Sequence, residues 1–311
     1  MKRTIHFEGA PVLPHDFPER WGYDSDFYFS GMNPPLDPRL ARGVDEWGCV
    51  WDNAGISNLG EVVSFPIKNW SDFNERMIPD VNDPNRWECL TGIRETAGDK
   101  YLICGGISIY ERVHFLRGLE NTWADIYENQ ENLCSLVDVL TDINIAAIEK
   151  YAALGADGCL FYDDWGLQDS LMINPLKWRE IWKPRYKRIF DTLHNHGMDA
   201  FLHSCGYIVD ILDDLIEIGL DVIQMDQQEN MGLELLGTRF GGRITFFSPV
   251  DIQKTLASGS TSEIERYCRD MKKYLATDNG GFIPRWYTDP DGAGHSEQSV
   301  RAMCDEFLRI S

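Results

Sequence analysis

The stretch DAFLHSCG, residues 199–206, predicts a buried strand with a candidate metal site at its end. Its apolar run predicts a buried strand, and Gly206 allows the chain to turn sharply after it. Because successive side chains of a strand point to opposite faces, we expect His203 and Cys205 on one face and Ser204 on the other. An imidazole and a thiolate side by side suit zinc better than magnesium or calcium. Taken alone, the pair also fits an ordinary polar strand end. The surrounding sequence is therefore needed to distinguish a metal site from a structural strand end.

Five further apolar runs lie along the chain on both sides of this stretch. The runs that predict strands are YLICGG (101–106), GCLFYDD (158–164), AFLHSC (200–205), DVIQMD (221–226), RITFFSP (243–249) and GGFIP (280–284). Between them, leucine and isoleucine at spacings of three and four residues predict helices at 131–155, 208–219 and 262–275. A fourth helical stretch, 175–197, contains Pro184 and is expected to kink or break there. Strands that alternate with helices form parallel sheets that are covered on both faces.

This alternation suits a closed (β/α)₈ barrel or an open, doubly wound sheet. No G-x-G-x-x-G motif follows a predicted strand, and polar residues recur at the carboxyl ends of the strands, where a barrel places its catalytic groups. We therefore predict an α/β fold, a (β/α)₈ TIM barrel, with residues 1–311 as a single domain. Residues 1–100 form an irregular N-terminal extension in which WGCVWD (47–52) and EVVSFP (61–66) predict a hairpin around DNAGISNLG (52–60).

The composition limits the classes of partner. A formal net charge of −21 over 311 residues repels nucleic acid and anionic membranes, so we expect neither as a partner. No apolar stretch is long enough to span a bilayer, and the first residues lack the apolar core of a secretion signal, which predicts a cytoplasmic protein. The eight cysteines include no C-x-x-C pair, as in an enzyme with reduced thiols. A small molecule is the expected substrate.

Polar side chains follow the predicted strands at their carboxyl ends, which a barrel brings to one mouth. The candidates for acid–base catalysis are Glu111, Asp163 and Asp164. Since Asp163 and Asp164 are adjacent, they are expected to point in opposite directions, one to the mouth and the other to the turn at Gly166 or to Arg185. Two more polar residues, Ser248 and Arg285, end later strands.

Aromatic residues beside these polar groups predict an apolar pocket for a flat ring. The residues predicted to bind the substrate are Tyr110, Tyr162, Trp165, Asp226, Phe247, Trp286 and Tyr287. The aromatic members of this set fit the core equally well, and Asp226 also fits a loop-capping aspartate.

Several longer motifs follow one another in a familiar order. They are YLICGGISIYERVHFLRGLEN (101–121), with Leu116, Arg117, Gly118 and Glu120, then FYDDWGLQDSLMINPLKWREIWKPRYKRI (161–189), HSCG (203–206) and DLIEIGLDVIQMDQ (214–227). DEWGCVWDNAG (45–55) and SFPIKNWSDF (64–73) precede them. With these motifs the chain resembles the uroporphyrinogen decarboxylase superfamily. The first hundred residues resemble its branch of corrinoid-dependent methyltransferases, which act on methanol, methylamine-derived methyl groups and aryl methyl ethers. The resemblance covers nearly the whole chain and implies a TIM barrel.

The resemblance implies two chemistries. Uroporphyrinogen decarboxylases hold a tetrapyrrole through an arginine-rich N-terminal segment and use no metal. Residues 1–50 here contain only the well-spaced Arg3, Arg20, Arg39 and Arg42. The methyltransferases use a His-x-Cys motif as two zinc ligands, which His203 and Cys205 match. Their third ligand is a cysteine near the carboxyl terminus, and DNGGFIPRW (278–286) has none. A zinc ion needs about three protein ligands; the candidates for the third are Asp163, Asp164, Glu111, Asp226 and His295.

We predict a methyltransferase, the O-demethylase component that moves a methyl group from a small methoxylated aromatic substrate to the cobalt of a separate corrinoid protein. An ether oxygen leaves badly, so its developing charge must be neutralised. Zinc at His203 and Cys205 would do so as a Lewis acid, or a carboxylic acid would do so by donating a proton. Two alternatives stay open: a metal-free decarboxylase with an aspartate at the mouth, and a non-catalytic corrinoid-binding barrel.

Overall fold

The computed structural model describes residues 1–33, 43–52 and 60–311. Its main sheet consists of seven parallel strands in the order β1-β4-β5-β6-β7-β8-β9. These strands are β1 (Phe27–Ser30), β4 (Tyr101–Gly105), β5 (Gly158–Tyr162), β6 (Asp199–His203), β7 (Val222–Gln224), β8 (Thr245–Ser248) and β9 (Phe282–Pro284). All six strands predicted from the apolar runs are confirmed, as β4 to β9.

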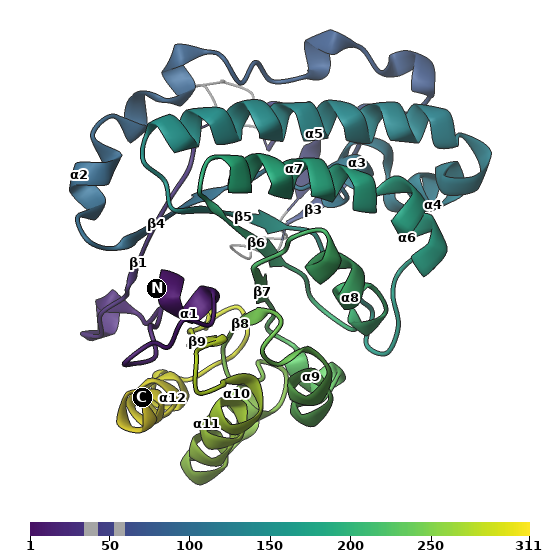
Figure 1. Cartoon of the computed structure of the whole chain (residues 1–311). Helices are drawn as coiled ribbons and strands as arrows, with labels where there is room; N and C mark the ends of the chain where they lie inside the picture. The colour runs from purple at the N-terminus through teal and green to yellow at the C-terminus, as the bar shows by residue number, and fades with distance from the viewer. Residues whose placement is uncertain (34–42, 53–59) are drawn as a thin grey trace.

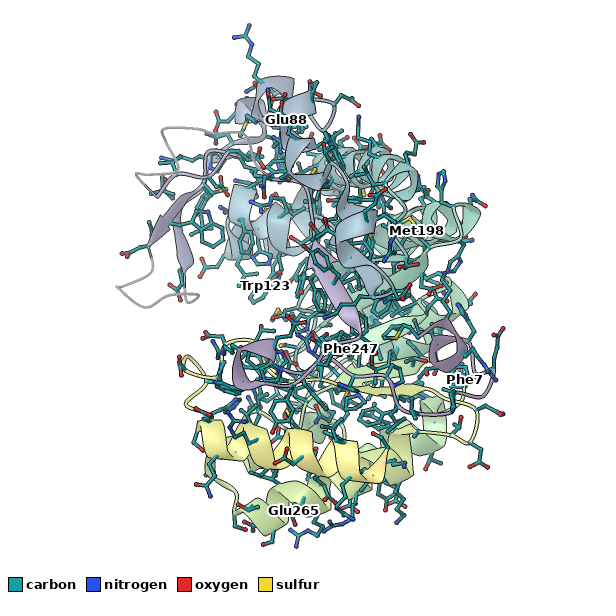
Figure 2. All side chains as sticks on the ribbon, turned by 90° about the vertical axis from the view of Figure 1, so that its left-hand side faces the viewer. Phe7, Glu88, Trp123, Met198, Phe247 and Glu265 are labelled. Atoms are coloured by element: carbon teal, nitrogen blue, oxygen red, sulfur yellow. The ribbon has the colours of Figure 1, made fainter. Side chains whose placement is uncertain are left out.

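The sheet curls around an apolar interior. Each of its seven strands contributes at least one side chain to this interior, and Ile5 completes it. The rings of Phe27 on β1 and Phe247 on β8 stack with their centroids 5.0 Å apart, although four strands separate β1 from β8 in the sheet. Figure 2 shows Phe247 at the centre of the molecule. Strands this far apart in a sheet touch only when the sheet is rolled up, so the architecture is barrel-like.

The edges of the curled sheet meet through a bridge. In the described part of the chain β1 and β9 do not pair with each other, and no eighth strand is present. The backbone N–H of Asp16 donates to the carbonyl of Pro284 at 3.0 Å, and that of Trp286 donates to the carbonyl of Asp16 at 3.0 Å. Asp16 also forms an isolated antiparallel bridge with Ser25, two residues before β1. The predicted eight-stranded barrel is thus replaced by seven strands and this bridge.

The N-terminal hundred residues are not only an extension. They supply β1, a strand of the main sheet that the sequence pattern did not predict. They also contain β2 (Val50–Asp52) and β3 (Glu61–Ser64), which pair antiparallel as the predicted hairpin requires. The connection between them falls on residues 53–59, which lie outside the described residues.

Helices cover the outside of the sheet. Figure 1 shows α5 and α7 side by side over one part of it, with α9, α11 and α12 over the part formed by the last strands. The helices are α1 (Lys2–Ile5), α2 (Ile93–Ala97), α3 (Glu111–Arg117), α4 (Leu119–Glu128), α5 (Gln130–Ala153), α6 (Pro175–Ile181), α7 (Lys183–Asn195), α8 (Val209–Glu217), α9 (Leu233–Phe240), α10 (Thr255–Ser258), α11 (Thr261–Leu275) and α12 (Glu297–Ile310). The break predicted at Pro184 is confirmed between α6 and α7. Within the described ranges, none of the helices combines the length and the apolar character that crossing a bilayer requires.

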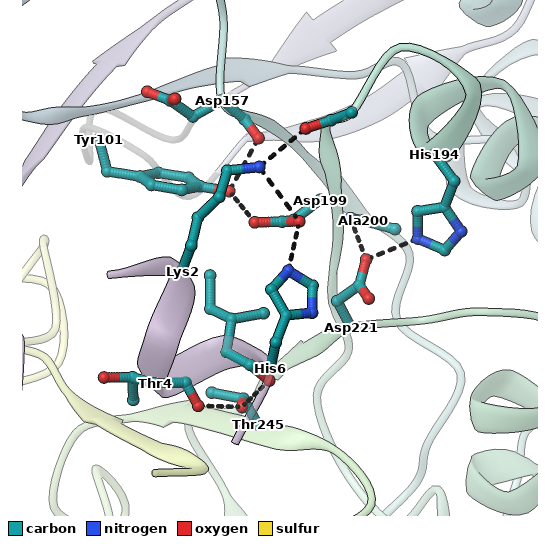
Figure 3. A network of polar contacts seen from close by, with 12 residues as sticks. Lys2, Thr4, His6, Tyr101, Asp157, His194, Asp199, Ala200, Asp221 and Thr245 are labelled. Atoms are coloured by element: carbon teal, nitrogen blue, oxygen red, sulfur yellow. Dashed lines mark hydrogen bonds and ion pairs between the residues drawn. The ribbon is translucent and has the colours of Figure 1, made fainter. Parts of the chain in front are cut away.

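The N-terminal segment covers the amino ends of the strands (Figure 3). Asp199, the first residue of β6, accepts a hydrogen bond from the hydroxyl of Tyr101 at 2.7 Å and contacts the His6 ring at 3.0 Å. The Lys2 ammonium lies 3.5 Å from the same carboxylate, and the Thr245 hydroxyl donates to the Ile5 carbonyl at 3.1 Å. With this end occupied, the carboxyl end of the sheet is the side on which a site can open.

Candidate functional site

Three possible metal ligands meet at the carboxyl ends of β5 and β6. The Cys205 sulfur lies 3.3 Å from Nε2 of His203, and a carboxylate oxygen of Asp164 lies 3.3 Å from the same nitrogen. One ligand atom from each of the three residues lies within 4.8 Å of those of the others. The predicted pair therefore comes together with Asp164, one of the five candidates for the third ligand. We call Asp164, His203 and Cys205 the ligand cluster.

Tight loops after β5 and β6 create this arrangement. Asp164 accepts a hydrogen bond from the backbone N–H of Cys205 at 2.8 Å, which ties one loop to the other. Gly206 adopts a positive φ of 74°, and a side chain there would collide with the backbone of Gly166. Ser204 points away from the cluster, and its hydroxyl accepts the backbone N–H of Trp165 at 3.0 Å. The predicted alternation of His203, Ser204 and Cys205 is thus what the structure shows.

A glutamine and a carboxylate orient the histidine. Nδ1 of His203 contacts the side-chain oxygen of Gln224, and the Gln224 amide nitrogen donates to Asp226 at 2.7 Å. A carboxylate only accepts hydrogen bonds, so the glutamine must turn its NH₂ toward Asp226 and its oxygen toward His203. The imidazole then carries a proton on Nδ1. Burial lowers the pKa of His203, but its contacts with Asp164 and Cys205 outweigh this and hold the pKa well above the ordinary value. A metal ion would therefore displace the Nε2 proton and take the lone pair on the side of Asp164 and Cys205.

The chemistry of the cluster fits zinc. Nitrogen, thiolate sulfur and carboxylate oxygen are its usual ligands, and three protein ligands leave a position for a substrate. Burial favours the neutral form of Asp164, yet its contacts with His203 and with the Cys205 N–H hold its pKa below the ordinary value. Burial raises the pKa of the Cys205 thiol, against the opposing effect of His203. Zinc binding would therefore release the thiol proton, as it does at other cysteine sites.

Replacing Gln224 by leucine is expected to weaken zinc binding by about 10- to 100-fold, because the acceptor that keeps the His203 proton on Nδ1 is lost. Zinc titration against a competing chelator measures this. Gln298→Leu changes the same residue type on α12 and should leave the affinity unchanged. An unchanged affinity in Gln224→Leu would show that the glutamine does not position the histidine.

Asp163 has a different role from its neighbour. It is fully buried, and its carboxylate accepts hydrogen bonds from the backbone N–H groups of Ile109, Tyr110 and Glu111 at 2.8–3.0 Å. The Tyr186 hydroxyl donates to it at 2.6 Å. Burial raises its pKa to about 6, although these four donors favour the ionised form. Asp163 therefore anchors the start of α3, with neither Gly166 nor Arg185 as its partner, and it faces away from the cluster.

Glu111 is the third predicted acid, at the first position of α3. Burial, and after it the charges of Asp163 and Asp164, raise the pKa of its carboxyl group to about 8. Among the described residues none donates a hydrogen bond to this carboxyl. Glu111 therefore keeps a proton at neutral pH and lies within electrostatic reach of the cluster. The remaining candidate for the third ligand, His295, instead contacts the Ile252 carbonyl at 2.9 Å.

A cavity of about 400 Å³ opens beside His203, a size suited to a small molecule. Its walls come from the carboxyl ends of β5, β6, β7 and β9 and from the loop after β9. Its polar and aromatic walls include Tyr162, His203, Gln224, Asp226, Arg285 and Tyr287. Three of the residues predicted to bind substrate, Tyr162, Asp226 and Tyr287, thus lie together.

The other four predicted substrate contacts lie elsewhere. Tyr110 and Trp165 are fully buried and stack on each other with centroids 3.9 Å apart. Phe247 belongs to the interior of the sheet, and Trp286 packs against Trp21 with centroids 5.8 Å apart. None of these four residues lines the cavity beside His203; Tyr110, Trp165 and Phe247 are buried, and Trp286 is half-buried.

Gln224 is a candidate positioning residue for His203 that the sequence pattern did not reveal. As a polar residue inside the run DVIQMD it looks like an ordinary strand residue. The feature that identifies it is the parallel pairing of β6 with β7, which makes His203 and Gln224 neighbours. Arg285, predicted only as a polar residue at a strand end, proves to be a wall of the cavity.

Comparison with known proteins places these features in a family. Residues 62–284 match the uroporphyrinogen decarboxylase (URO-D) family. The chain is 24% identical over 224 residues to uroporphyrinogen decarboxylase from Nocardia farcinica, covering 67% of this chain and 56% of that protein. It is 21% identical over 205 residues to the methylcobamide:CoM methyltransferase MtbA from Methanosarcina acetivorans, covering 64% of this chain and 59% of that protein. The chain thus matches little more than half the length of these curated relatives.

A solved structure supports the fold. A methyltransferase from Methanosarcina mazei superimposes with a TM-score of 0.63 at 17% identity, covering 89% of this chain and 79% of that one. The family match runs from β3 to the end of β9 and includes Glu111 and the whole ligand cluster. The resemblance predicted from the sequence is confirmed: the chain belongs to the uroporphyrinogen decarboxylase family.

Proposed function

We propose that this protein is a methyltransferase that moves a methyl group from a small methoxylated aromatic substrate to the cobalt of a separate corrinoid protein. In this proposal Asp164, His203 and Cys205 hold a zinc ion. The observation that carries it is the ligand cluster itself, with His203 oriented through Gln224 and Asp226. A metal-free decarboxylase has no use for such an arrangement. The presence of MtbA among the relatives is consistent with methyl transfer.

The chain's own residues supply binding, orientation and a proton. When bound, zinc would polarise the ether oxygen as a Lewis acid. Tyr162 and Tyr287 would flank the aromatic ring in the cavity. The methyl carbon would pass to the cobalt, whose electron pair forms the new bond, while the electrons of the broken C–O bond stay on oxygen. Glu111, protonated at neutral pH, would donate its proton to that oxygen.

The decarboxylase alternative finds no support in the N-terminal arginines that the structure describes. Arg3 donates to the Glu8 carbonyl, and Arg20 lies over Trp21, 4.8 Å from its ring centroid. Neither lines the cavity beside His203. Arg39 and Arg42 fall outside the described residues. Of these N-terminal arginines, the two that the structure describes therefore do not reach the cavity.

Methyl transfer to free cob(I)alamin tests the proposal. Zinc-loaded protein is mixed with cob(I)alamin and one donor from a panel of methoxylated aromatics, methanol and methylamines, and methylcobalamin is followed by its absorbance. We expect methylcobalamin from a methoxylated aromatic. Transfer only from methanol or a methylamine would contradict the substrate class. No transfer from any donor, together with carbon dioxide release from uroporphyrinogen, would establish the decarboxylase instead.

Replacing Glu111 by glutamine is expected to lower the rate of methyl transfer by about 10²- to 10⁴-fold, because the proton donor is lost. A general acid acts only while it is protonated, so the wild-type rate should fall as the pH rises through the pKa of Glu111, which is about 8 without metal and which zinc at the neighbouring cluster would lower. The variant should lack this alkaline limb and keep its zinc. Glu120→Gln, on the exposed surface of α4, is the matched control. The same alkaline limb in Glu111→Gln would assign the proton to another group.

A further inference from the structure

Arg285 differs from the other buried arginines of the described chain. The three are Arg86, Arg117 and Arg285, with at most 9% of their surface exposed. Arg86 pairs with Glu46, and Nε of Arg117 lies 2.8 Å from Asp125. Arg285 has no carboxylate within ion-pair distance among the residues that the structure describes. Asp16, its partner in an isolated parallel bridge, is a buried counter-charge that lies beyond ion-pair distance, and one carboxylate oxygen of Asp16 has no hydrogen-bond partner in the described chain.

The guanidinium of Arg285 is held in place, but not all of its N–H groups form hydrogen bonds in the described chain. Its Nε donates to the carbonyl of Trp286 at 3.1 Å, and its central carbon lies 4.7 Å from the ring centroid of Phe247. Its two terminal nitrogens have no hydrogen-bond partner in the described ranges. Because Arg285 lines the same cavity as His203, these N–H groups are available to a molecule bound there.

The carboxylates near Arg285 have other partners. Asp226 accepts from Gln224, and Asp289 accepts from the backbone N–H of Gly292 at 3.2 Å. Asp16 senses the charge of Arg285 but binds the Ser25 hydroxyl at 2.9 Å. An anionic group that entered the cavity would be repelled by Asp226 and Asp289 and attracted to Arg285.

We propose that Arg285 binds a carboxylate of the substrate. A planar guanidinium offers two parallel N–H groups that match a carboxylate, and Arg285 brings terminal N–H groups without a partner in the described chain to the cavity wall. The inference rests on the proposed function and narrows its substrate class to methoxylated aromatic carboxylates. With the carboxylate at Arg285, the rest of the molecule extends along the cavity toward His203 and the ligand cluster.

Two probes of nearly equal shape test this. Binding of 3-methoxybenzoate and of the neutral 3-methoxybenzamide is measured by calorimetry with the zinc-loaded full chain, without any corrinoid. Wild-type protein should bind the benzoate about 10- to 100-fold more tightly than the amide, as expected for hydrogen bonds to a charged group. In Arg285→Gln the ratio should fall to about 1. Arg20→Gln removes an arginine outside the cavity and should keep the wild-type ratio.

The outcomes separate this inference from the proposed function. Equal binding of the two probes by wild-type protein, binding of neither, or a preference that persists in Arg285→Gln would each overturn the carboxylate site. A preference lost in Arg285→Gln supports the site even when cob(I)alamin is not methylated, in which case only the proposed function falls. Methyl transfer from a neutral ether without a binding preference leaves the function standing and removes the role of Arg285.

Discussion

Replacing Asp163 by alanine is expected to lower the free energy of unfolding by about 3–5 kcal/mol. The substitution leaves the N–H groups of Ile109, Tyr110 and Glu111 and the hydroxyl of Tyr186 without their acceptor in a fully buried place. An unsatisfied buried donor costs about 1–3 kcal/mol, although water entering the space of the lost side chain would recover part of this. Urea unfolding followed by tryptophan fluorescence measures the change.

Asp163→Asn is the graded control for this result. One amide oxygen can still accept the N–H groups of Tyr110 and Glu111, which both bind the same carboxylate oxygen. The NH₂ group then faces the Ile109 N–H and the Tyr186 hydroxyl, so part of the loss remains. We expect a destabilisation of about 1–3 kcal/mol. Wild-type stability in Asp163→Ala, combined with lost activity, would contradict the structural role and return Asp163 to the catalytic candidates.

Replacing Asp164 by asparagine should lower the zinc affinity and leave the stability nearly unchanged. The amide oxygen can still accept the Cys205 N–H, so we expect the free energy of unfolding to change by less than about 1 kcal/mol. A neutral amide is a poor zinc ligand, and the zinc affinity is expected to fall by about 100-fold or more, with methyl transfer falling alongside it. Chelator competition and the cob(I)alamin assay measure the two effects.

The two predictions together test whether Asp163 supports the fold and Asp164 binds zinc. Both substitutions remove a carboxylate, from adjacent positions, yet one should lower stability and the other zinc affinity. If Asp164→Asn bound zinc as tightly as the wild type, Asp164 would not be the third ligand. Glu111 and Asp226 would then be the next candidates, because the Glu111 carboxyl group senses the charges of the cluster and an Asp226 oxygen lies 3.9 Å from Nδ1 of His203.

Strand alternation explains why two of the three residues of the ligand cluster could be predicted as a pair. His203 and Cys205 are two residues apart at the end of one strand, and their common face follows from local geometry alone. The same rule predicted that Asp163 and Asp164 would diverge. It could not say which of them faces the mouth, since that depends on how the loop after β5 meets Gly206.

The sequence pattern could not predict which residues of different strands would contact each other. Gln224 faces His203 because of the register between β6 and β7, which no local sequence feature determines. In the sequence, Tyr110 and Trp165 lie next to acids that were predicted to face the mouth of the barrel. The loops that carry them nevertheless turn their rings into the core. β1 was missed for a related reason. Of its four residues only Phe27 is buried, so FYFS lacks the continuous apolar character of the other strands.

The zinc content of the purified wild-type protein is the decisive measurement for the proposed metal site. Elemental analysis should find about one zinc per chain after dialysis against zinc-containing buffer. A double variant, His203→Ala with Cys205→Ala, should be folded and free of zinc. A folded wild-type protein that takes up no zinc would contradict the account and leave proton donation by Glu111 as the means of releasing the oxygen.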